Sequence, residues 1–497
     1  MTISNYFDSI GVPMSDQSLP IRVAWFSTLA TESGSLGALY TQAIAPLLAK
    51  QYSIEVFTST SDWRRIARTC LRPTYEGLAV YHYLSFILRD REQPFDYLIY
   101  QVEDDPTADF VTTMLPLYPG IAICHDGTLS RIYNARQAHA TTGEILNDML
   151  RREYGDHAPL LGDFRKRAWP TSIFDRRYPL GRNDLRAAAL VLAMNEALQR
   201  SLSALSPSCY RTTFPIEVTK QISPERRKTL RRELDLTEGD VVFGFVGERD
   251  PDDRVMTTLR AVRLVREELE RNADEQTSQF KVLWIVSEPS KVAWAESCVR
   301  TVFGADEPGL NSFRVTSPSP QCNLGELVSL VDVLGAFRFD PLRGTRAAFW
   351  FAGAEAIPVM ALKLEQYADF PEPSLVLIPP GRGEGDIIAR NLYTLVTDLR
   401  LRRSIGSALA NFLTLTASPL AVAEDLIQIM KTNRGALADL LQQARVTMNQ
   451  RERELVSPMQ RRLSGESALV DEIDRELRRI IYRRVEQDFG WGGELPQ

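Results

Sequence analysis

The sequence has few of the residues that build metal centres and disulfide frameworks. It contains four histidines and five cysteines in 497 residues, and no two of the cysteines form a C-x-x-C pair. No cluster of histidine, cysteine and carboxylate residues has the spacing of a metal site, so we expect no bound metal ion. Scattered, unpaired cysteines are typical of the reduced thiols of a cytoplasmic protein.

Long apolar runs and a positive net charge are also missing. No stretch approaches about 18 consecutive apolar residues, so we expect no membrane-spanning helix. Residues 1–20 are polar, lack the apolar segment of a signal peptide and are expected to form a flexible leader. The net charge of −6 gives no electrostatic reason to expect a nucleic-acid partner. These absences favour a cytoplasmic protein with at most a peripheral contact at the inner face of the membrane.

Apolar strands and helix-like segments alternate along most of the chain. The run RVAWFS is followed by a Ser/Thr/Gly loop, a helix-period segment and a second strand, which is the unit of a parallel doubly wound sheet. The expected strands are 22–27, 53–59, 78–84, 96–101 and 120–126 in the first half, and 240–247, 280–287, 312–318, 333–339, 357–363 and 374–380 in the second half. The alternation predicts an α/β fold with two such sheets.

The length of the chain predicts two domains and an appendage. We expect an N-terminal domain over 21–214, interrupted by a charged helical insertion at 136–183, and a C-terminal domain over 215–430. The Pro-, Ser- and Thr-rich segment 206–224 is the expected linker between them.

Residues 431–497 are charged, helix-prone and without strand signals, and we expect a helical C-terminal extension. It can consist of solvated helices that pack on the body, or it can form a homo- or hetero-oligomeric contact. The apolar positions that favour such a contact are Leu469, Ile473, Leu477, Ile480 and Ile481.

Several segments resemble, in order, bacterial glycosyltransferases of family 4. They are FSTLATESGSLGALYTQAIAPLLAKQYSIEVFT, FDYLIYQVEDDP, PLYPGIAICHDGTLSRIY, the mid-domain helices expected within 147–159 and 176–202, VDVLGAFRFDP, QYADFPE and LIPPGRGEGDIIARNLYTLVTDLRLRRSIGSALANFL. The resemblance covers residues 21–430 and implies a GT-B fold, in which two Rossmann-like domains face a cleft. It also implies hexosyltransferase-type transfer from a nucleotide-diphosphate sugar to a glycan, lipid-linked glycan or protein. Retention of anomeric configuration is implied as well, without a metal or other cofactor.

The glycine loop after the first strand is one candidate site. Gly34, Ser35 and Gly37 allow the backbone to approach a ligand, and amides at the start of the following helix attract anions. The resemblance implies contacts with the donor phosphate and the acceptor. A simple strand–helix turn is the alternative.

His125 and Asp126 end the strand GIAICHD at the expected edge of the cleft, and they are the predicted catalytic residues. An imidazole at this place can bind a sugar hydroxyl or orient the acceptor. The resemblance implies that it lies beside the reacting sugar. The alternative is a structural histidine whose hydrogen bonds are satisfied within the fold.

Arg249 and Arg254 follow the strand at 240–247, where cations can stabilise a leaving diphosphate. Arg338 adds positive charge from a neighbouring strand end. The chain departs from the family pattern at Asp250, which stands where the family has a lysine. A salt-bridged surface loop is therefore the alternative to a phosphate site.

The stretch FRFDPLRGTRAAFWFAGAEAIPVMA has the strand–loop–helix–strand order of a nucleotide-sugar donor pocket. Its loop, however, lacks the carboxylate residue that such a pocket normally carries. The family's two sugar-binding glutamates fall near Gly344 and at Phe351. Thr345 and the loop backbone can still bind phosphate. Asp369 matches an acid of the family segment Y-A-E-L-P, and it either positions the donor-side loop or caps a helix.

Two functions have support in the sequence, and a third, a GT-B enzyme of another class such as a nucleotide-sugar epimerase, has no specific feature in its favour. The first is an active glycosyltransferase with an altered donor pocket. The second is a catalytically inactive GT-B protein that acts as a binding or scaffold partner of a glycosyltransferase complex; the missing acid and the added C-terminal segment favour it. Fold alone does not decide between them.

Overall fold

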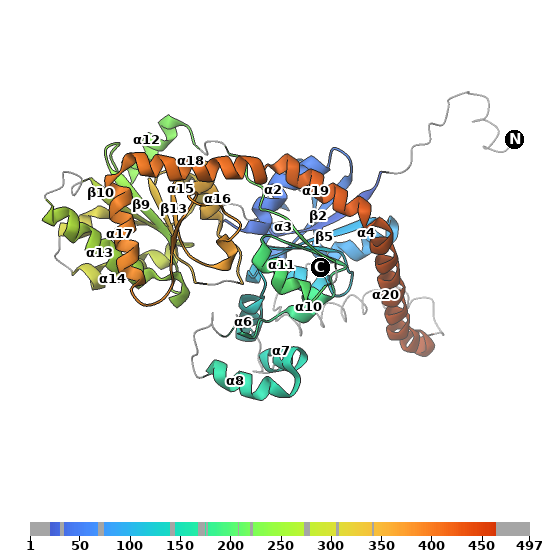
Figure 1. The fold of residues 1–497 in the computed structure, drawn as a ribbon. Helices are drawn as coiled ribbons and strands as arrows, with labels where there is room; N and C mark the ends of the chain where they lie inside the picture. The colour runs from blue at the N-terminus through green and yellow to red at the C-terminus, as the bar shows by residue number, and fades with distance from the viewer. Residues whose placement is uncertain are drawn as a thin grey trace, which may run out of the picture.

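A computed structural model describes most of the chain. The described residues are 20–29, 34–67, 74–139, 145–166, 174, 177–206, 208–218, 222–272, 279–304, 308–339 and 342–463. They form two α/β lobes joined by a long helical crossover (Figure 1). Each lobe is built on one sheet, and the two sheets are separate.

The sheet of the first lobe has eight strands in the order β3-β4-β2-β1-β5-β6-β7-β8. Neighbouring strands are parallel except for the antiparallel pair β3 and β4. The strands are β1 (Arg22–Phe26), β2 (Ser53–Thr58), β3 (Thr74–Tyr75), β4 (Leu78–His82), β5 (Tyr97–Val102), β6 (Ile121–Cys124), β7 (Leu190–Ala193) and β8 (Cys209–Arg211).

The sheet of the second lobe has six strands, all parallel, in the order β11-β10-β9-β12-β13-β14. They are β9 (Val241–Val246), β10 (Phe280–Ile285), β11 (Phe313–Thr316), β12 (Val333–Ala336), β13 (Val359–Leu362) and β14 (Val376–Ile378). The central strands are buried on both faces, which explains their continuous apolar runs.

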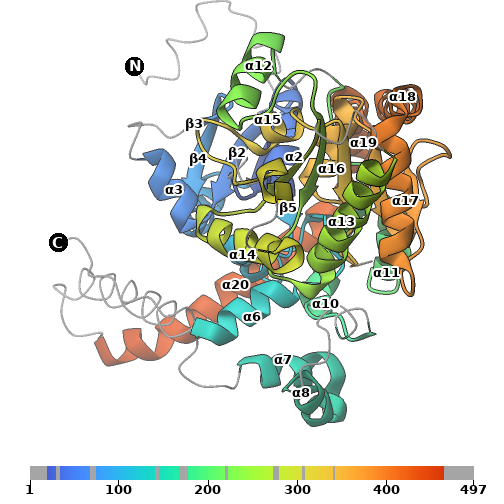
Figure 2. The same ribbon diagram turned by 90° about the vertical axis from the view of Figure 1, so that its left-hand side faces the viewer.

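Helices lie on both faces of the sheets. Those of the first lobe are α2 (Leu36–Leu48), α3 (Thr60–Ala67), α4 (Phe86–Glu92), α5 (Asp109–Met114), α6 (Ser130–His139), α7 (Ile145–Tyr154), α8 (Ala158–Lys166), α10 (Arg182–Arg186) and α11 (Glu196–Ser203). Those of the second are α12 (Pro224–Glu233), α13 (Val255–Arg271), α14 (Val292–Phe303), α15 (Leu324–Val328), α16 (Ala347–Ala354), α17 (Glu384–Thr397) and α18 (Leu399–Thr416). Two views agree that α7 and α8, within the expected insertion, lie apart from the sheets (Figures 1 and 2).

Every strand that the sequence predicts is present, but three more occur where none was expected: the two-residue β3, which pairs antiparallel with β4, and the strands β7 and β8. β7 lies inside 176–202, and the expectation of helix there was wrong for these four residues. Its sequence, LVLA, is a short apolar run buried on both faces, which periodicity alone cannot distinguish from a helix. β8 lies inside the expected linker 206–224 and pairs with β7 at the edge of the sheet.

The chain crosses back from the second lobe to the first through α18 and α19 (Pro419–Thr432) (Figure 1). α19 packs on α2 of the first lobe, although the sequence placed it in the second domain. Residues 399–432 are long and apolar enough to cross a membrane by length and composition. The segment is partly buried, since Leu409, Leu413, Val422 and Leu426 belong to the core, whereas Leu415 and Leu420 are exposed.

The last described helix is α20 (Arg434–Leu463), which docks on the first lobe. Leu437 and Leu441 are buried in the core. Arg445 binds both carboxylate oxygens of Asp90, at 2.8 and 2.6 Å. The expectation of a helix that packs on the body therefore describes its first half. Residues 1–19 of the expected leader (1–20) and the apolar positions from Leu469 to Ile481 lie outside the described residues.

Candidate functional site

The residues that follow the strands of the two sheets meet where the lobes face each other. Glu103 directly follows β5, and Asp126 lies just beyond β6. The loop 342–346, between β12 and α16, comes from the second lobe. The carbonyl of Leu342 in that loop accepts a hydrogen bond of 2.6 Å from the amide of Gly127. Since parallel sheets bind ligands at this edge, the interlobe contact is the candidate site.

Three donors at the start of α2 bind one carboxylate. The Ser35 hydroxyl caps the helix and donates to Oε2 of Glu103 at 2.8 Å. The amides of Leu36 and Gly37 donate to Oε1 and Oε2 of the same side chain, both at 3.1 Å. We call these three donors the anion position, because a helix N-terminus attracts negative charge. The predicted glycine loop thus forms an anion-binding arrangement, and Glu103 fills it.

Glu103 is held in a place that disfavours its charge. Burial raises the pKa of Glu103 to about 7, and the nearby carboxylates of Asp105 and Asp126 add to the rise. The hydrogen bonds from Ser35 and Leu36 lower the pKa and offset only part of this. Near neutral pH the anion position therefore holds a carboxyl group that is readily protonated.

Two glycines allow the lobes to touch at this site. A Cβ on Gly34, which has a φ of +79°, would lie 2.6 Å from Leu324 and 3.3 Å from Ala347 of the second lobe. A Cβ on Gly344 would lie 2.3 Å from the carbonyl oxygen of His125. The backbone approach is therefore closer than any side chain at these positions permits.

A buried ion pair joins the lobes beside these glycines. Arg343 Nη2 lies 3.0 Å from Asp104 Oδ2, and their side chains are 8% and 1% exposed. We call this contact the interlobe ion pair. Asp104 also accepts hydrogen bonds from the amides of Arg131 and Ile132, in the first turn of α6, at 2.8 and 3.2 Å. Arg343 lies in the loop 342–346, which carries no acid, and its side chain reaches Asp104 of the first lobe.

Asp126 adds a second polar link between the lobes. Its Oδ1 accepts a hydrogen bond of 2.8 Å from the amide of Gly344, and its Oδ2 accepts one of 2.7 Å from the amide of Asp104. Both carboxylate oxygens are therefore engaged by backbone amides. In this arrangement Asp126 fixes the loop 342–346 against the first lobe.

His125 is fully buried, and burial lowers its pKa to about 3. Its Nε2 lies 2.7 Å from Oε1 of Gln101, and its ring packs edge-on against Tyr40 and Phe214. A neutral ring that donates through Nε2 has an acceptor at Nδ1. Among the described residues this Nδ1 has no hydrogen-bond partner. At neutral pH the imidazole can orient a hydroxyl group, but it carries no charge.

A cavity of about 360 Å³ lies between the lobes beside His125. We call it the hinge-side cavity, because the crossing segments 212–214 and α18 form part of its wall. It collects four of the predicted site residues: His125, Gly344, Thr345 and Asp369.

Asp369 links the lobes at the hinge-side cavity. It accepts hydrogen bonds from the amide of Glu196, at the start of α11, at 3.1 Å, and from Arg211 at 3.4 Å. Both partners belong to the first lobe. The helix-cap alternative therefore describes the Glu196 contact, whereas the contact with Arg211 was not expected.

The predicted phosphate-binding arginines lie away from this cavity. Arg249 is exposed. Arg254 pairs with Glu384 at 3.3 Å, and Arg338 lies 4.0 Å from both Asp250 and Asp253. The alternative of a salt-bridged loop describes Arg254 and Arg338.

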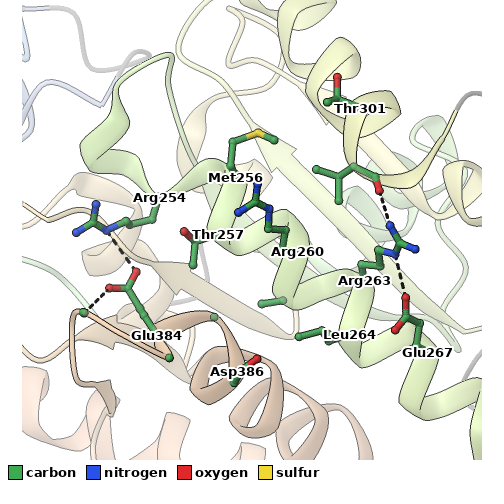
Figure 3. Close-up of a pocket in the computed structure, with 15 residues that line it drawn as sticks. Arg254, Met256, Thr257, Arg260, Arg263, Leu264, Glu267, Thr301, Glu384 and Asp386 are labelled. Carbon is green, nitrogen blue, oxygen red and sulfur yellow. Dashed lines mark hydrogen bonds and ion pairs between the residues drawn. The ribbon is translucent and has the colours of Figure 1, made fainter.

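A second, larger hollow of about 880 Å³ lies between α13 and the start of α17. Figure 3 shows the Arg254 side chain turned toward Glu384, and Arg263 turned toward Glu267 and the carbonyl of Val302. Most of its charges are paired within the protein. It does not form a cluster of cations ready for a diphosphate.

The sequence reasoning missed Glu103, Asp104 and Arg211. Three acids directly after a buried strand, in YQVEDDP, were a signal for the first two of these residues, because strand ends gather at the ligand edge. Arg211 was not considered because it lies in the segment 206–224, which was expected to be a linker. In the described part of the chain no group of three or more His, Cys, Asp and Glu side chains could hold a metal ion.

The two lobes, each with a parallel sheet and facing each other through their strand ends, define a GT-B fold. Solved structures of this fold match the chain along nearly all of their own length. Anabaena HepE in complex with UDP and glucose has a TM-score of 0.51 and 12% identity, over 83% of this chain and 100% of its own. WaaG, a glycosyltransferase involved in lipopolysaccharide biosynthesis, has a TM-score of 0.50 and 12% identity, over 81% and 98%. Sucrose-phosphate synthase from Thermosynechococcus elongatus has a TM-score of 0.56 and 12% identity, over 84% and 99%.

At this identity the likeness shows the fold alone. No protein-family model matches the chain, and no curated protein matches its sequence. Membership of glycosyltransferase family 4 therefore stays a prediction.

Proposed function

We propose that this chain is a GT-B glycosyltransferase that takes its sugar from a nucleotide-diphosphate sugar bound between the lobes. The observation that carries the proposal is the anion position. Ser35, Leu36 and Gly37 aim three donors at one point on the ligand edge of the sheet, facing the start of α16 in the second lobe. Such a helix terminus is suited to phosphate. The HepE structures with UDP and UDP-glucose support a donor of this class.

In this proposal the donor diphosphate replaces the Glu103 carboxylate. A diphosphate keeps its charge at neutral pH, whereas burial brings the pKa of Glu103 to about 7. The same three donors therefore bind the diphosphate more strongly. The loop 342–346 has to move away from Asp126 to make room, since even a Cβ on Gly34 would lie only 3.3 Å from Ala347 in the present arrangement.

The proposed reaction breaks the bond between the anomeric carbon and the diphosphate oxygen and forms one to an acceptor hydroxyl oxygen. The proton of the acceptor hydroxyl leaves with the diphosphate. Amide dipoles at the anion position stabilise the charge that develops on the leaving group. Retention of configuration and independence of metal belong to the proposal through the family resemblance.

A second candidate is a catalytically inactive GT-B protein that binds a partner. The interlobe ion pair favours it, because Arg343 and Asp104 close the cleft with two buried charges. The filled anion position and the absence of an acid in the loop 342–346 point the same way. In this case the lobes form one fixed body and its surface carries the function.

Calorimetry against UDP, GDP and their sugars separates the two candidates. For an enzyme we expect nucleotide binding to the wild type. The Glu103→Ala variant should bind at least about tenfold more tightly, because its competing carboxylate is gone. Asp105→Asn is the matched control, since Asp105 is the neighbouring acid but makes no contact with α2. It should leave the affinity near that of the wild type.

Absence of binding in both the wild type and Glu103→Ala contradicts the enzyme proposal and favours the second candidate. Binding without release of free UDP or GDP in the presence of mixed glycan acceptors supports a nucleotide-binding but inactive protein.

A further inference from the structure

The hinge-side cavity has the features of a built site. It is bounded by both lobes, and its volume of about 360 Å³ suits a small molecule. Leu36 and Gly344 line it, and the amide of Leu36 is also part of the anion position. The cavity therefore adjoins the place where the donor diphosphate is proposed to bind.

One lining residue of the cavity has a buried polar atom without a partner. His125 lines the cavity, is fully buried and has no partner for Nδ1 among the described residues. A buried acceptor without a partner is costly unless a ligand or water supplies a donor. Because the ring is neutral at physiological pH, a hydroxyl group suits it as well as any charged donor.

Aromatic rings form one wall. Phe214 stacks on Trp350 with ring centroids 5.3 Å apart, and Phe370 lies 6.1 Å from Trp350 and 5.3 Å from Phe412. A pyranose ring presents flat C–H faces and an edge of hydroxyl groups. Aromatic walls with a few convergent polar groups bind ligands of this shape.

The charges of the cavity disfavour phosphate. Its charged lining residues are Arg211, Asp369 and Asp425, which leave one net negative charge with His125 neutral. Arg211 is already paired with Asp369. A phosphorylated sugar would be repelled by the remaining carboxylate, whereas an uncharged sugar would not.

We infer that the hinge-side cavity binds the uncharged sugar end of the acceptor, so that the acceptor is a glycan terminus and not a sugar phosphate. This inference rests on the proposed glycosyltransferase function. Sucrose-phosphate synthase shares the fold, and its name indicates a phosphorylated sugar product for that protein. The net negative charge of the hinge-side cavity disfavours a phosphorylated sugar as the ligand of this chain.

Calorimetry and thermal unfolding without any nucleotide test the inference. The probes are glucose, galactose, mannose, N-acetylglucosamine and short oligosaccharides of each, at up to about 50 mM. Glucose 6-phosphate is the charged counterpart. We expect saturable binding and a raised Tm with at least one uncharged sugar, because the ligand binds only the folded state. Glucose 6-phosphate should bind at least about tenfold more weakly than glucose.

A charge-reversal variant tests more specifically whether the charge of the cavity excludes a phosphorylated sugar. Asp425 is exposed at the cavity, so Asp425→Lys should fold. It should improve the binding of glucose 6-phosphate by about tenfold and leave that of glucose nearly unchanged. The matched control is Glu424→Lys, which makes the same change at an exposed neighbour that does not line the cavity. That control should leave both affinities as in the wild type.

Three results overturn the inference. One is the absence of saturable binding for every uncharged sugar, and another is equal or tighter binding of glucose 6-phosphate to the wild type. The third is an equal effect of Asp425→Lys and Glu424→Lys. Because no nucleotide is present, these results are independent of the donor experiment. Failure of nucleotide binding with intact sugar binding would refute the transferase proposal and leave a sugar-binding site.

Discussion

Breaking the interlobe ion pair should loosen the contact between the lobes. Asp104→Asn keeps the shape of the side chain but removes the buried carboxylate that lies 3.0 Å from the Arg343 guanidinium. Breaking a buried pair by removing one partner typically costs about 3–5 kcal/mol. Here we expect about 3 kcal/mol, the lower end, because Arg343 keeps its contact with the Ser130 hydroxyl at 3.3 Å. The asparagine oxygen can also still accept a hydrogen bond from an amide of α6.

Amide hydrogen exchange reports this loss directly. The amides of Gly127 and Gly344 donate across the lobes, so they exchange only when the lobes part. A loss of about 3 kcal/mol predicts exchange about 100-fold faster at these two amides. Amides inside β1 should change little. The double variant Asp104→Asn/Arg343→Met should recover part of the loss, because no unpaired charge remains.

The matched control is a similar pair on the surface. Arg263 and Glu267 lie 2.9 Å apart with side chains 50% and 44% exposed. Glu267→Gln should cost less than about 0.5 kcal/mol. If Asp104→Asn accelerates exchange at Gly127 and Gly344 by less than about threefold, the interlobe ion pair does not hold the lobes together and the reasoning is refuted.

Three further predictions concern other contacts of the same region. The pKa of Glu103 is raised from 4.5 to about 7 in the folded state, so its contribution to stability is present below pH 4.5 and is lost as the pH rises to about 7. For Glu103, urea unfolding should show a loss of about 3 kcal/mol over this window that is missing in Glu103→Gln, whereas the loss due to Asp104, whose pKa burial also raises to about 7, remains in both; equal pH profiles would contradict the pKa shift of Glu103. Gly344→Ala should separate the lobes, because its Cβ would lie 2.3 Å from the His125 carbonyl oxygen; small-angle scattering should give a larger radius of gyration, and an unchanged one would count against the close contact. Arg445→Ala should release α20 from Asp90 and expose it to limited proteolysis, whereas an unchanged digestion pattern would mean that apolar packing alone holds the helix.

The architecture of the chain could be predicted from its sequence to a large extent. Buried parallel strands require continuous apolar runs, and runs such as RVAWFS and VVFGFVG can be recognised without a structure. The failures were short elements. β7 has four residues between helices, and β8 lies in a segment rich in turn-forming residues. Such elements form because a neighbouring strand offers hydrogen bonds, which is not visible in local sequence.

The candidate site could be predicted in part. Gly34, Ser35 and Gly37 were identified because a loop between a strand and a helix has a known geometry and aims its amides at one point. The sequence also shows that the loop 342–346 carries an arginine and no acid. The places of Arg254 and Arg338 could not be predicted, since an arginine pairs with whichever carboxylate the fold brings near.

The sequence by itself determined two α/β units, the glycine loop at the start of α2 and a loop at 342–346 that carries arginines and no acid, because each depends on residues close together in the chain. Only the tertiary structure decided that Glu103 fills the anion position, that Arg343 reaches Asp104 and that His125 lines a cavity with Asp369. These contacts join residues far apart in sequence, and they depend on how closely two separately folded sheets approach each other.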